Sequence, residues 1–160
     1  MKSKAVLAPL FLCAAALAAF AGAEQTVNDL LPKLAAARVE DRYSAQMELQ
    51  NLALHAGRPG AEAERVEVAN ILAAKATDSD VPQPARVWVV RQLEYIGAAE
   101  SIAALTTLLN GTDSELKECA RRALEKNPTP GATESLRAAL KQGGDPTALL
   151  RKTKETIFGA

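Results

Sequence analysis

The sequence predicts an all-α protein, specifically a right-handed α-solenoid of about three stacked αα-hairpins. Alanine and leucine, two of the strongest helix formers, dominate the chain. Apolar residues recur at three- and four-residue spacing, and short loops rich in Gly, Pro, Asn and Asp separate these stretches. One stretch resembles the stretch that follows it, and an internal repeat of two helices is typical of stacked helical hairpins.

Composition excludes several classes of protein. The chain has 160 residues, which favours a single domain. It carries 19 basic and 19 acidic residues, so it lacks the basic excess of a nucleic-acid-binding protein. Its 2 cysteines are too few for a disulfide scaffold.

Residues 1–23 are predicted to be a secretory signal peptide. Lys2 and Lys4 precede an apolar run over residues 5–20, and Ala21-Gly22-Ala23 supplies small residues for cleavage before Glu24. The run is short for a membrane span, although an uncleaved anchor is the alternative. Lipidation at Cys13 is disfavoured because the preceding residue is Leu12. We therefore expect an exported protein, periplasmic or secreted, with no membrane span after cleavage.

The first half of the remaining chain predicts three helices. One starts near Thr26 or Asn28 and ends near Ala37, and the others cover Val39–His55 and Ala61–Ala76. Gly57 is expected to end the second helix in a left-handed conformation. The apolar residues expected to pack inward are Tyr43, Met47, Leu49, Leu52 and Leu54 in the second helix, and Val66, Val68, Ala69, Ile71 and Leu72 in the third.

The second half predicts four further helices at Pro84–Ile96, Ala99–Leu109, Ser114–Lys126 and Thr133–Lys141. Ser114 is the expected N-cap of the third of these. A further helix can start at Thr147. The residues expected to form the core of this half are Ala85, Val89, Leu93, Ile96, Ile102, Leu105, Leu109, Leu116, Ala120, Leu124, Leu136 and Leu140.

The repeat becomes visible when residues 85–109 are shifted by 31 positions onto residues 116–140. Five of the 25 aligned positions are then identical, among them Leu93 with Leu124 and Glu94 with Glu125. The predicted units are the N-terminal helices with a first atypical repeat (24–80), two repeats (81–113 and 114–145), and a partial helix or start of a further repeat (146–160).

The segments ARVWVVRQLEYIGAAESIAALTTLL (85–109) and ARRALEKNPTPGATESLRAAL (120–140) resemble HEAT-type repeats of the armadillo and PBS-lyase-like group. They are similar to exported repeat proteins of bacterial envelopes, such as those of planctomycetes. The segment MELQNLALHAGRPGAEAERVEVANIL (47–72) resembles the N-terminal repeat of such proteins. The resemblance implies the solenoid fold and is almost silent on function.

Residues with chemical potential do not form a recognisable catalytic or metal-binding pattern. His55 is the only histidine, and the sequence supplies it with no nucleophile motif. Cys119 aligns with Trp88 between the repeats and is expected on a packing face. One His and one Cys are too few for a zinc site, and the acidic residues form no calcium loop. Trp88 and Tyr95 are expected to pack between helices, although a ligand-stacking role is an alternative.

The sequence therefore predicts no catalytic, cofactor or metal residues and no small-molecule site. It favours a non-enzymatic protein-interaction or scaffold module that binds a protein partner on its second helices. The exposed positions expected there are Thr106, Thr107, Arg137 and Lys141. Two alternatives stay open: the N-terminal fragment of a longer HEAT-repeat protein, and an accessory subunit of a lyase-like enzyme.

Overall fold

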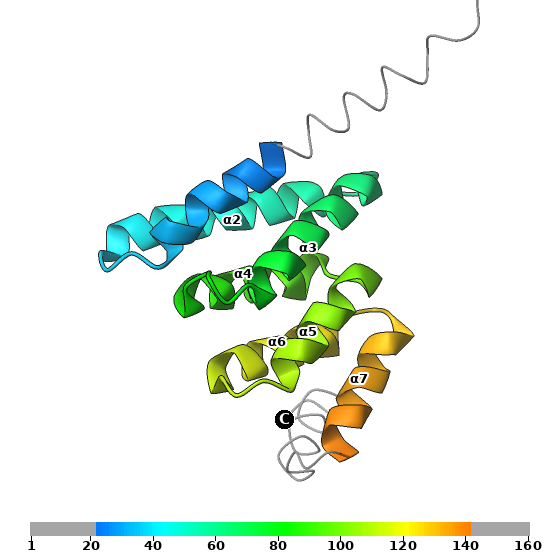
Figure 1. The fold of residues 1–160 in the computed structure, drawn as a ribbon. Coiled ribbons are helices and arrows are strands. Elements are labelled where there is room, and N and C mark those ends of the chain that lie inside the picture. Colours follow the sequence, from blue (N-terminus) through cyan, green and yellow to red (C-terminus); the bar gives the residue numbers. More distant parts are fainter. Residues whose placement is uncertain (1–21, 142–160) are drawn as a thin grey trace, which may run out of the picture.

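The protein is all-α in a computed structural model that describes residues 22–141. Residues 22–34 are helical, and six α-helices and one 3-10 turn follow. Their bounds are α2 Val39–Ala56, α3 Glu62–Thr77, α4 Gln83–Ile96, η1 Ala99–Ser101, α5 Ile102–Leu109, α6 Ser114–Lys126 and α7 Pro130–Lys141 (Figure 1). The predicted signal peptide, apart from residues 22 and 23, and the predicted partial helix at 146–160 lie outside the described residues.

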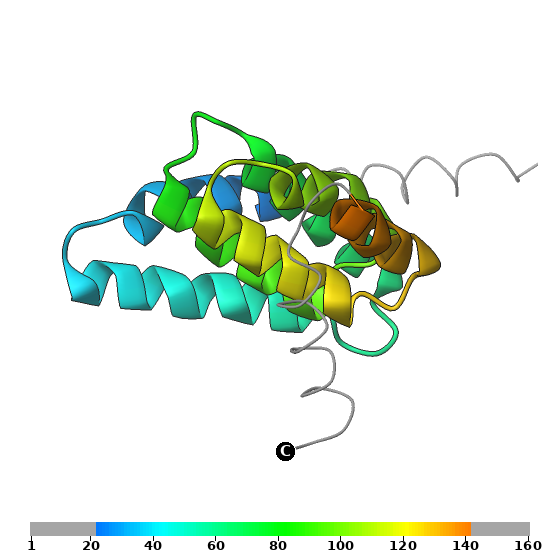
Figure 2. The same ribbon diagram turned by 90° about the horizontal axis from the view of Figure 1, so that it is seen from below.

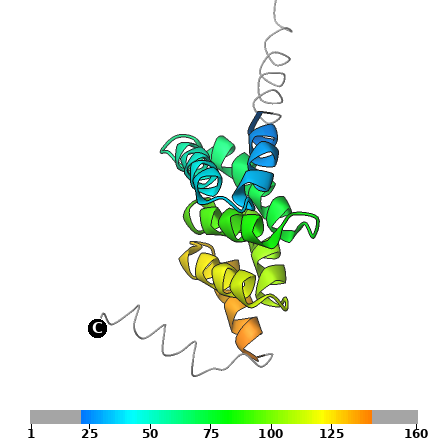
Figure 3. The same cartoon turned by 90° about the vertical axis from the view of Figure 1, so that its left-hand side faces the viewer.

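The helices form two layers that run along the molecule from residues 22–34 to α7. Helices α2, α4 and α6 follow one another in one layer, with α4 packed against both of the others. Helices α3, α5 and α7 form the second layer, and α4 and α6 pack across onto α3 and α5 (Figure 3). Viewed from below, α2 lies along one edge of the described structure (Figure 2).

The packing of α2 corrects one expectation about the core. The helix bounds match the prediction to within one residue, but Tyr43, Met47 and Leu54 are exposed. The buried face of α2 consists of Leu49, as expected, together with Ala45, Ala53 and Ala56. Both sets have helical spacing, and the alanine-rich set faces inward because small side chains let α4 approach closely. Val66 of α3, also expected inside, is 37% exposed.

Helix bounds and turns differ from the sequence prediction in four further places, the first being the N-terminal helix, which covers residues 22–34 and ends before Ala37. Asp113 caps α6 instead of Ser114, since its carboxylate accepts hydrogen bonds from the backbone N–H groups of Glu115 (3.0 Å) and Leu116 (2.9 Å). The segment expected as one helix from Ala99 begins with the 3-10 turn η1, and α7 starts at Pro130 instead of Thr133. A proline in the first turn lacks only an N–H that would stay unpaired there.

The glycine after α2 allows close approach instead of a left-handed turn. Gly57 has a φ of −79°, and the left-handed residue of this loop is Gly60 with a φ of 83°. A Cβ at Gly57 would lie 3.0 Å from the Cγ2 atom of Ile96. The C-terminal end of α2 is therefore pressed against the C-terminal end of α4.

Most of the core predicted for the second half is confirmed. Nine of the twelve residues are buried, and Ile102, Leu136 and Leu140 are half-buried. Leu136 and Leu140 lie on α7, which packs mainly on α5 and α6. A helix with neighbours on one side can bury only one stripe of its surface. At the opposite end, residues 22–34 bury Val27, Leu30, Leu31 and Leu34.

Replacing Gly97 with alanine should destabilise the protein by about 2 kcal/mol, in the range of other overpacked sites. A Cβ there would lie 2.6 Å from the backbone oxygen of Leu93 and 2.7 Å from Ser101 Oγ. Urea unfolding followed by circular dichroism measures the change. The matched control is Gly131→Ala, whose Cβ would meet only the flexible tip of Ile102 at 3.0 Å. Equal stability of both variants would contradict the close packing at Gly97.

Candidate interaction surface

The four positions predicted to line a binding surface lie on two adjacent helices of the second layer. Thr106 and Thr107 are on α5, and Arg137 and Lys141 are on α7, which packs against α5. Thr106 is half-buried, and its hydroxyl donates a 2.9 Å hydrogen bond to Ser135 Oγ of α7. Thr106 is therefore part of a helix–helix contact, while Thr107, Arg137 and Lys141 are exposed.

A larger apolar surface lies on α2, where sequence reasoning placed core residues. The exposed fractions are 64% for Val39, 63% for Tyr43, 39% for Met47 and 56% for Leu54. Residues four apart on a helix share a face, and so do residues separated by seven. We call these four residues the α2 seam. The sequence does contain a sign of this surface. A second row of residues with helical spacing can also face the core, and it consists of Ala45, Leu49, Ala53 and Ala56.

The outer face of the neighbouring α4 carries two aromatic residues. Tyr95 is 66% exposed, so the expectation that it packs between helices is wrong, whereas Trp88 is half-buried against the core. The Arg91 guanidinium lies 4.8 Å from the centre of the Trp88 ring, and Lys126 Nζ lies 5.4 Å from that of Tyr95. Cations at these distances interact favourably with aromatic faces. Five of the six large apolar side chains exposed among the described residues are therefore on α2 and α4.

The only histidine lies in an exposed cluster and not in a catalytic arrangement. His55 Nε2 is 3.6 Å from Glu64 Oε1, and Arg58 forms a closer pair of 2.8 Å with the other oxygen of that carboxylate. The hydrogen bond from Arg58 is the main cause that lowers the pKa of Glu64. An exposed imidazole beside one ion-paired carboxylate matches a residue at a helix end, where positive charge is favoured.

Cys119 is buried on α6, as the repeat alignment predicts. Burial raises the pKa of its thiol, and this outweighs the opposing effect of the hydrogen bond and charge of Arg91. A protonated thiol is a poor nucleophile. The position therefore serves packing between α4 and α6.

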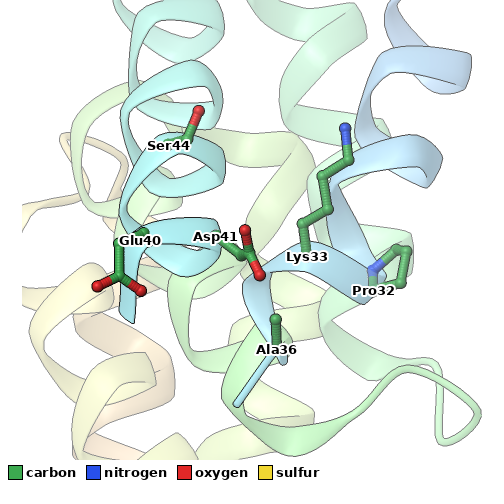
Figure 4. A pocket seen from close by; sticks show the side chains of 6 residues that line it. All are labelled: Pro32, Lys33, Ala36, Glu40, Asp41 and Ser44. Carbon is green, nitrogen blue, oxygen red and sulfur yellow. The ribbon is translucent and has the colours of Figure 1, made fainter. Parts of the chain in front are cut away.

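A shallow pocket of about 440 Å³ lies between residues 32–36 and the first turns of α2. Figure 4 shows its lining of Pro32, Lys33, Ala36, Glu40, Asp41 and Ser44. Its charged side chains have opposite signs, and its lining includes neither a histidine nor a cysteine that could activate Ser44. Among residues 22–141, no group of three or more His, Cys, Asp or Glu could hold a metal ion. No helix in this part of the chain is long and apolar enough to cross a membrane.

Ion pairs tie neighbouring helices together. Glu94 of α4 has only 3% of its side chain exposed, and it lies 3.1 Å from both Arg122 and Lys126 of α6. Arg65 of α3 donates to Glu100 and to the backbone oxygen of Ile96, each at 2.6 Å. Arg121 of α6 is buried and pairs with Glu118 and Glu125 of its own helix. These charged side chains are paired with one another and stabilise the fold. The α2 seam, in contrast, consists of exposed apolar side chains.

Comparison with known proteins gave no match to a family model, a curated protein or a solved structure.

Glu100→Gln should destabilise the protein by about 1.5 kcal/mol at pH 7, as for other hydrogen bonds to charged groups. Burial raises the pKa of Glu100, but the hydrogen bonds from Arg65 and from backbone N–H groups outweigh it and hold that pKa below its ordinary value of 4.5. A carboxylate with a lowered pKa stabilises the fold above pH 4.5 and loses this effect as the pH falls through its folded-state pKa. The stability gap between the variant and the wild type should therefore close in acid.

Urea unfolding at pH 7 and at about pH 3 measures this gap. Glu48→Gln is the matched control, because Glu48 is exposed in the middle of α2 and should show a small effect at both pH values. If the difference in stability between Glu100→Gln and the wild type is the same at both pH values, the charge of Glu100 does not stabilise its contact with Arg65.

Proposed function

We propose that this protein is a non-enzymatic protein-interaction module that is exported from a bacterial cytoplasm. The binding surface in this proposal is the α2 seam together with Tyr95 of α4. This moves the surface from the α5 and α7 residues that the sequence favours to the opposite layer of helices. The observation that carries it is that five of the six large apolar side chains exposed among the described residues lie on the adjacent helices α2 and α4.

Exposed apolar side chains that lie next to one another are the usual mark of a protein-binding site. Tyrosine and methionine are enriched where proteins bind one another, and lysine and glutamate are depleted. The α2 seam follows this pattern, since it places Tyr43 and Met47 between Val39 and Leu54 and includes no charged side chain. Exposed apolar residues that share one face also carry a risk of aggregation, which burial against a binding partner would remove.

The proposed architecture is a HEAT-like α-solenoid. Support comes from the two layers, in which each helix packs against the next helix of its own layer. One of the five identical pairs of the repeat alignment also occupies the same environment, since Leu93 and Leu124 are each 1% exposed. Such stacks present long surfaces of successive helices, which are suited to binding other proteins.

Two features favour a binding role over an enzymatic one. The exposed His55 has one neighbouring carboxylate, and Arg58 already pairs with it. The raised pKa of Cys119 makes its thiol a poor nucleophile. The proposed export depends on the pattern of residues 1–23 alone, and it places the partner in the periplasm or outside the cell.

The test uses the tagged protein to capture partners from a bacterial periplasmic extract. Wild type should retain a specific partner, and Tyr43→Glu with Leu54→Glu should reduce capture by about tenfold or more, because a charge in the centre of an apolar interface is strongly unfavourable. Val66→Glu is the matched control, since Val66 is exposed to a similar extent as Met47 but lies on α3.

Arg137→Glu tests the surface on α5 and α7 that the sequence favours. Capture should be unchanged in this variant. Loss of capture in Arg137→Glu with retention in the seam variant would overturn the proposed surface. Absence of any specific partner would overturn the proposed function.

A further inference from the structure

We propose that Asn110, in the loop between α5 and α6, is a site of spontaneous deamidation, and that opening of this loop controls the rate of the reaction. The reaction places a new carboxylate between the two helices and thereby weakens the stack at this point. The inference goes beyond the proposed function and does not depend on it.

The sequence makes Asn110 the most reactive asparagine of the chain. It precedes Gly111, and no other asparagine is followed by glycine. Deamidation begins when the backbone nitrogen of the next residue attacks the side-chain carbonyl carbon, and glycine leaves that nitrogen unshielded because it has no side chain. Asn51 and Asn70 are also exposed, but they lie within α2 and α3 and precede a leucine and an isoleucine. These two residues therefore serve as references within the same molecule.

The reaction needs only water in addition to the chain. The Gly111 nitrogen forms a bond with Cγ of Asn110 while the bond from Cγ to Nδ2 breaks, and the side-chain nitrogen leaves as ammonia with the proton of Gly111. This step gives a five-membered cyclic imide. Water then opens the ring at either carbonyl and gives an aspartate or an isoaspartate, without oxidation or reduction. Asparagine is accordingly among the thermally labile residues of proteins.

The folded loop holds Asn110 in a geometry that does not react. Ring closure requires Cβ of Asn110 to eclipse the Gly111 nitrogen about the Cα–C bond. With a ψ of −1°, the backbone nitrogen of Asn110 eclipses it instead, so this bond must first turn by about a third of a circle. The Gly111 N–H also donates a 3.1 Å hydrogen bond to the backbone oxygen of Leu108. The loop must therefore open before Asn110 reacts.

The loop has the features of a segment that opens without unfolding of the whole domain. Asn110 and Thr112 are exposed, and Gly111 is half-buried. One end is held by a 3.1 Å hydrogen bond from the N–H of Asn110 to Thr106, and the other by the carboxylate of Asp113 that caps α6. Exposed segments of this kind open locally at a lower free energy than global unfolding. When opening and closing are fast, the rate of deamidation is the intrinsic rate multiplied by the open fraction.

The product is unfavourable for the folded state. Asn110 is the C-cap of α5, and the C-terminal end of a helix carries a partial negative charge. A carboxylate is repelled there, whereas a neutral carboxamide is not. An isoaspartate also adds one carbon atom to the backbone and lengthens the connection between α5 and α6. Modified chains should therefore unfold at a lower urea concentration than unmodified chains.

Peptide mapping by mass spectrometry of the purified full chain, stored at about pH 8 and about 37 °C, measures the reaction. A mass gain of about 1 Da should accumulate at Asn110 about tenfold faster than at Asn51 or Asn70. In urea, where the chain is unfolded, Asn110 should react at least about tenfold faster than in the folded chain. A folded chain in which Asn110 reacts no faster than Asn51 and Asn70 would refute the site. Equal rates in the folded chain and in urea would refute control by opening.

Two capping variants separate local opening from global unfolding. Asp113→Ala removes the N-cap of α6 and should raise the rate at Asn110 about fivefold, a typical effect of losing such a cap. Asp78→Ala is the matched control, because the Asp78 carboxylate accepts a 2.9 Å hydrogen bond from the N–H of Asp80 in the loop between α3 and α4. It should leave the rate at Asn110 unchanged. Equal acceleration by both variants would show that the reaction follows global unfolding, which contradicts the proposal.

Urea unfolding of Asn110→Asp tests the effect on the fold. This variant carries the charge of the product, so its unfolding midpoint should lie below that of the wild type. The stored wild type should show a second population with a lowered midpoint as deamidation proceeds. Unchanged midpoints in both Asn110→Asp and the deamidated chain would overturn the proposed weakening of the stack.

Discussion

Helix α4 is buried against α2, α3 and α6 at once, and the rest of the described structure depends on that contact. Eight of its 14 residues are buried. Val89 and Leu93 fill the space between the two layers, while Glu94 extends to the cations of α6. A buried carboxylate is tolerated only when it is paired. The pairing therefore fixes α6 in register beside α4, and the apolar contacts hold α2 and α3 on the other sides.

The same contact accounts for the exposed seam. Helix α2 approaches α4 through Ala45, Ala53 and Ala56, and a Cβ at Gly57 would already press on Ile96. A larger side chain on this face would push the two helices apart. This face buries Leu49 together with the alanines, whereas Val39, Tyr43, Met47 and Leu54 remain exposed. Binding a partner, as proposed, would remove the risk of aggregation that these exposed side chains carry.

The sequence allowed the helices to be predicted closely but not the orientation of each helix. Proline, glycine and polar turns mark where α2, α3, α4 and α6 begin and end, because these signals are local. Helix α2 carries two stripes with helical spacing, and only the approach of α4 selects the alanine stripe. Tyr95 was also misplaced, because its ring lies exposed beside Lys126 of α6 and not between helices. The three valines of α4 have a low intrinsic helix propensity, but all three are buried, and the free energy gained by their burial stabilises the helix. The predicted surface residue Thr106 was misplaced because its hydroxyl partner, Ser135, is 29 residues away.

Native-state hydrogen exchange of each helix tests the central position of α4 most directly. Amides in the most deeply packed element exchange only when the whole domain unfolds, whereas those at the ends open locally. The account predicts that the amides of Val89, Val90 and Leu93 are the slowest, with an opening free energy equal to that of global unfolding. It also predicts faster exchange in residues 22–34 and in α7. Exchange in α4 that is as fast as in α7 would contradict the dependence of the fold on α4.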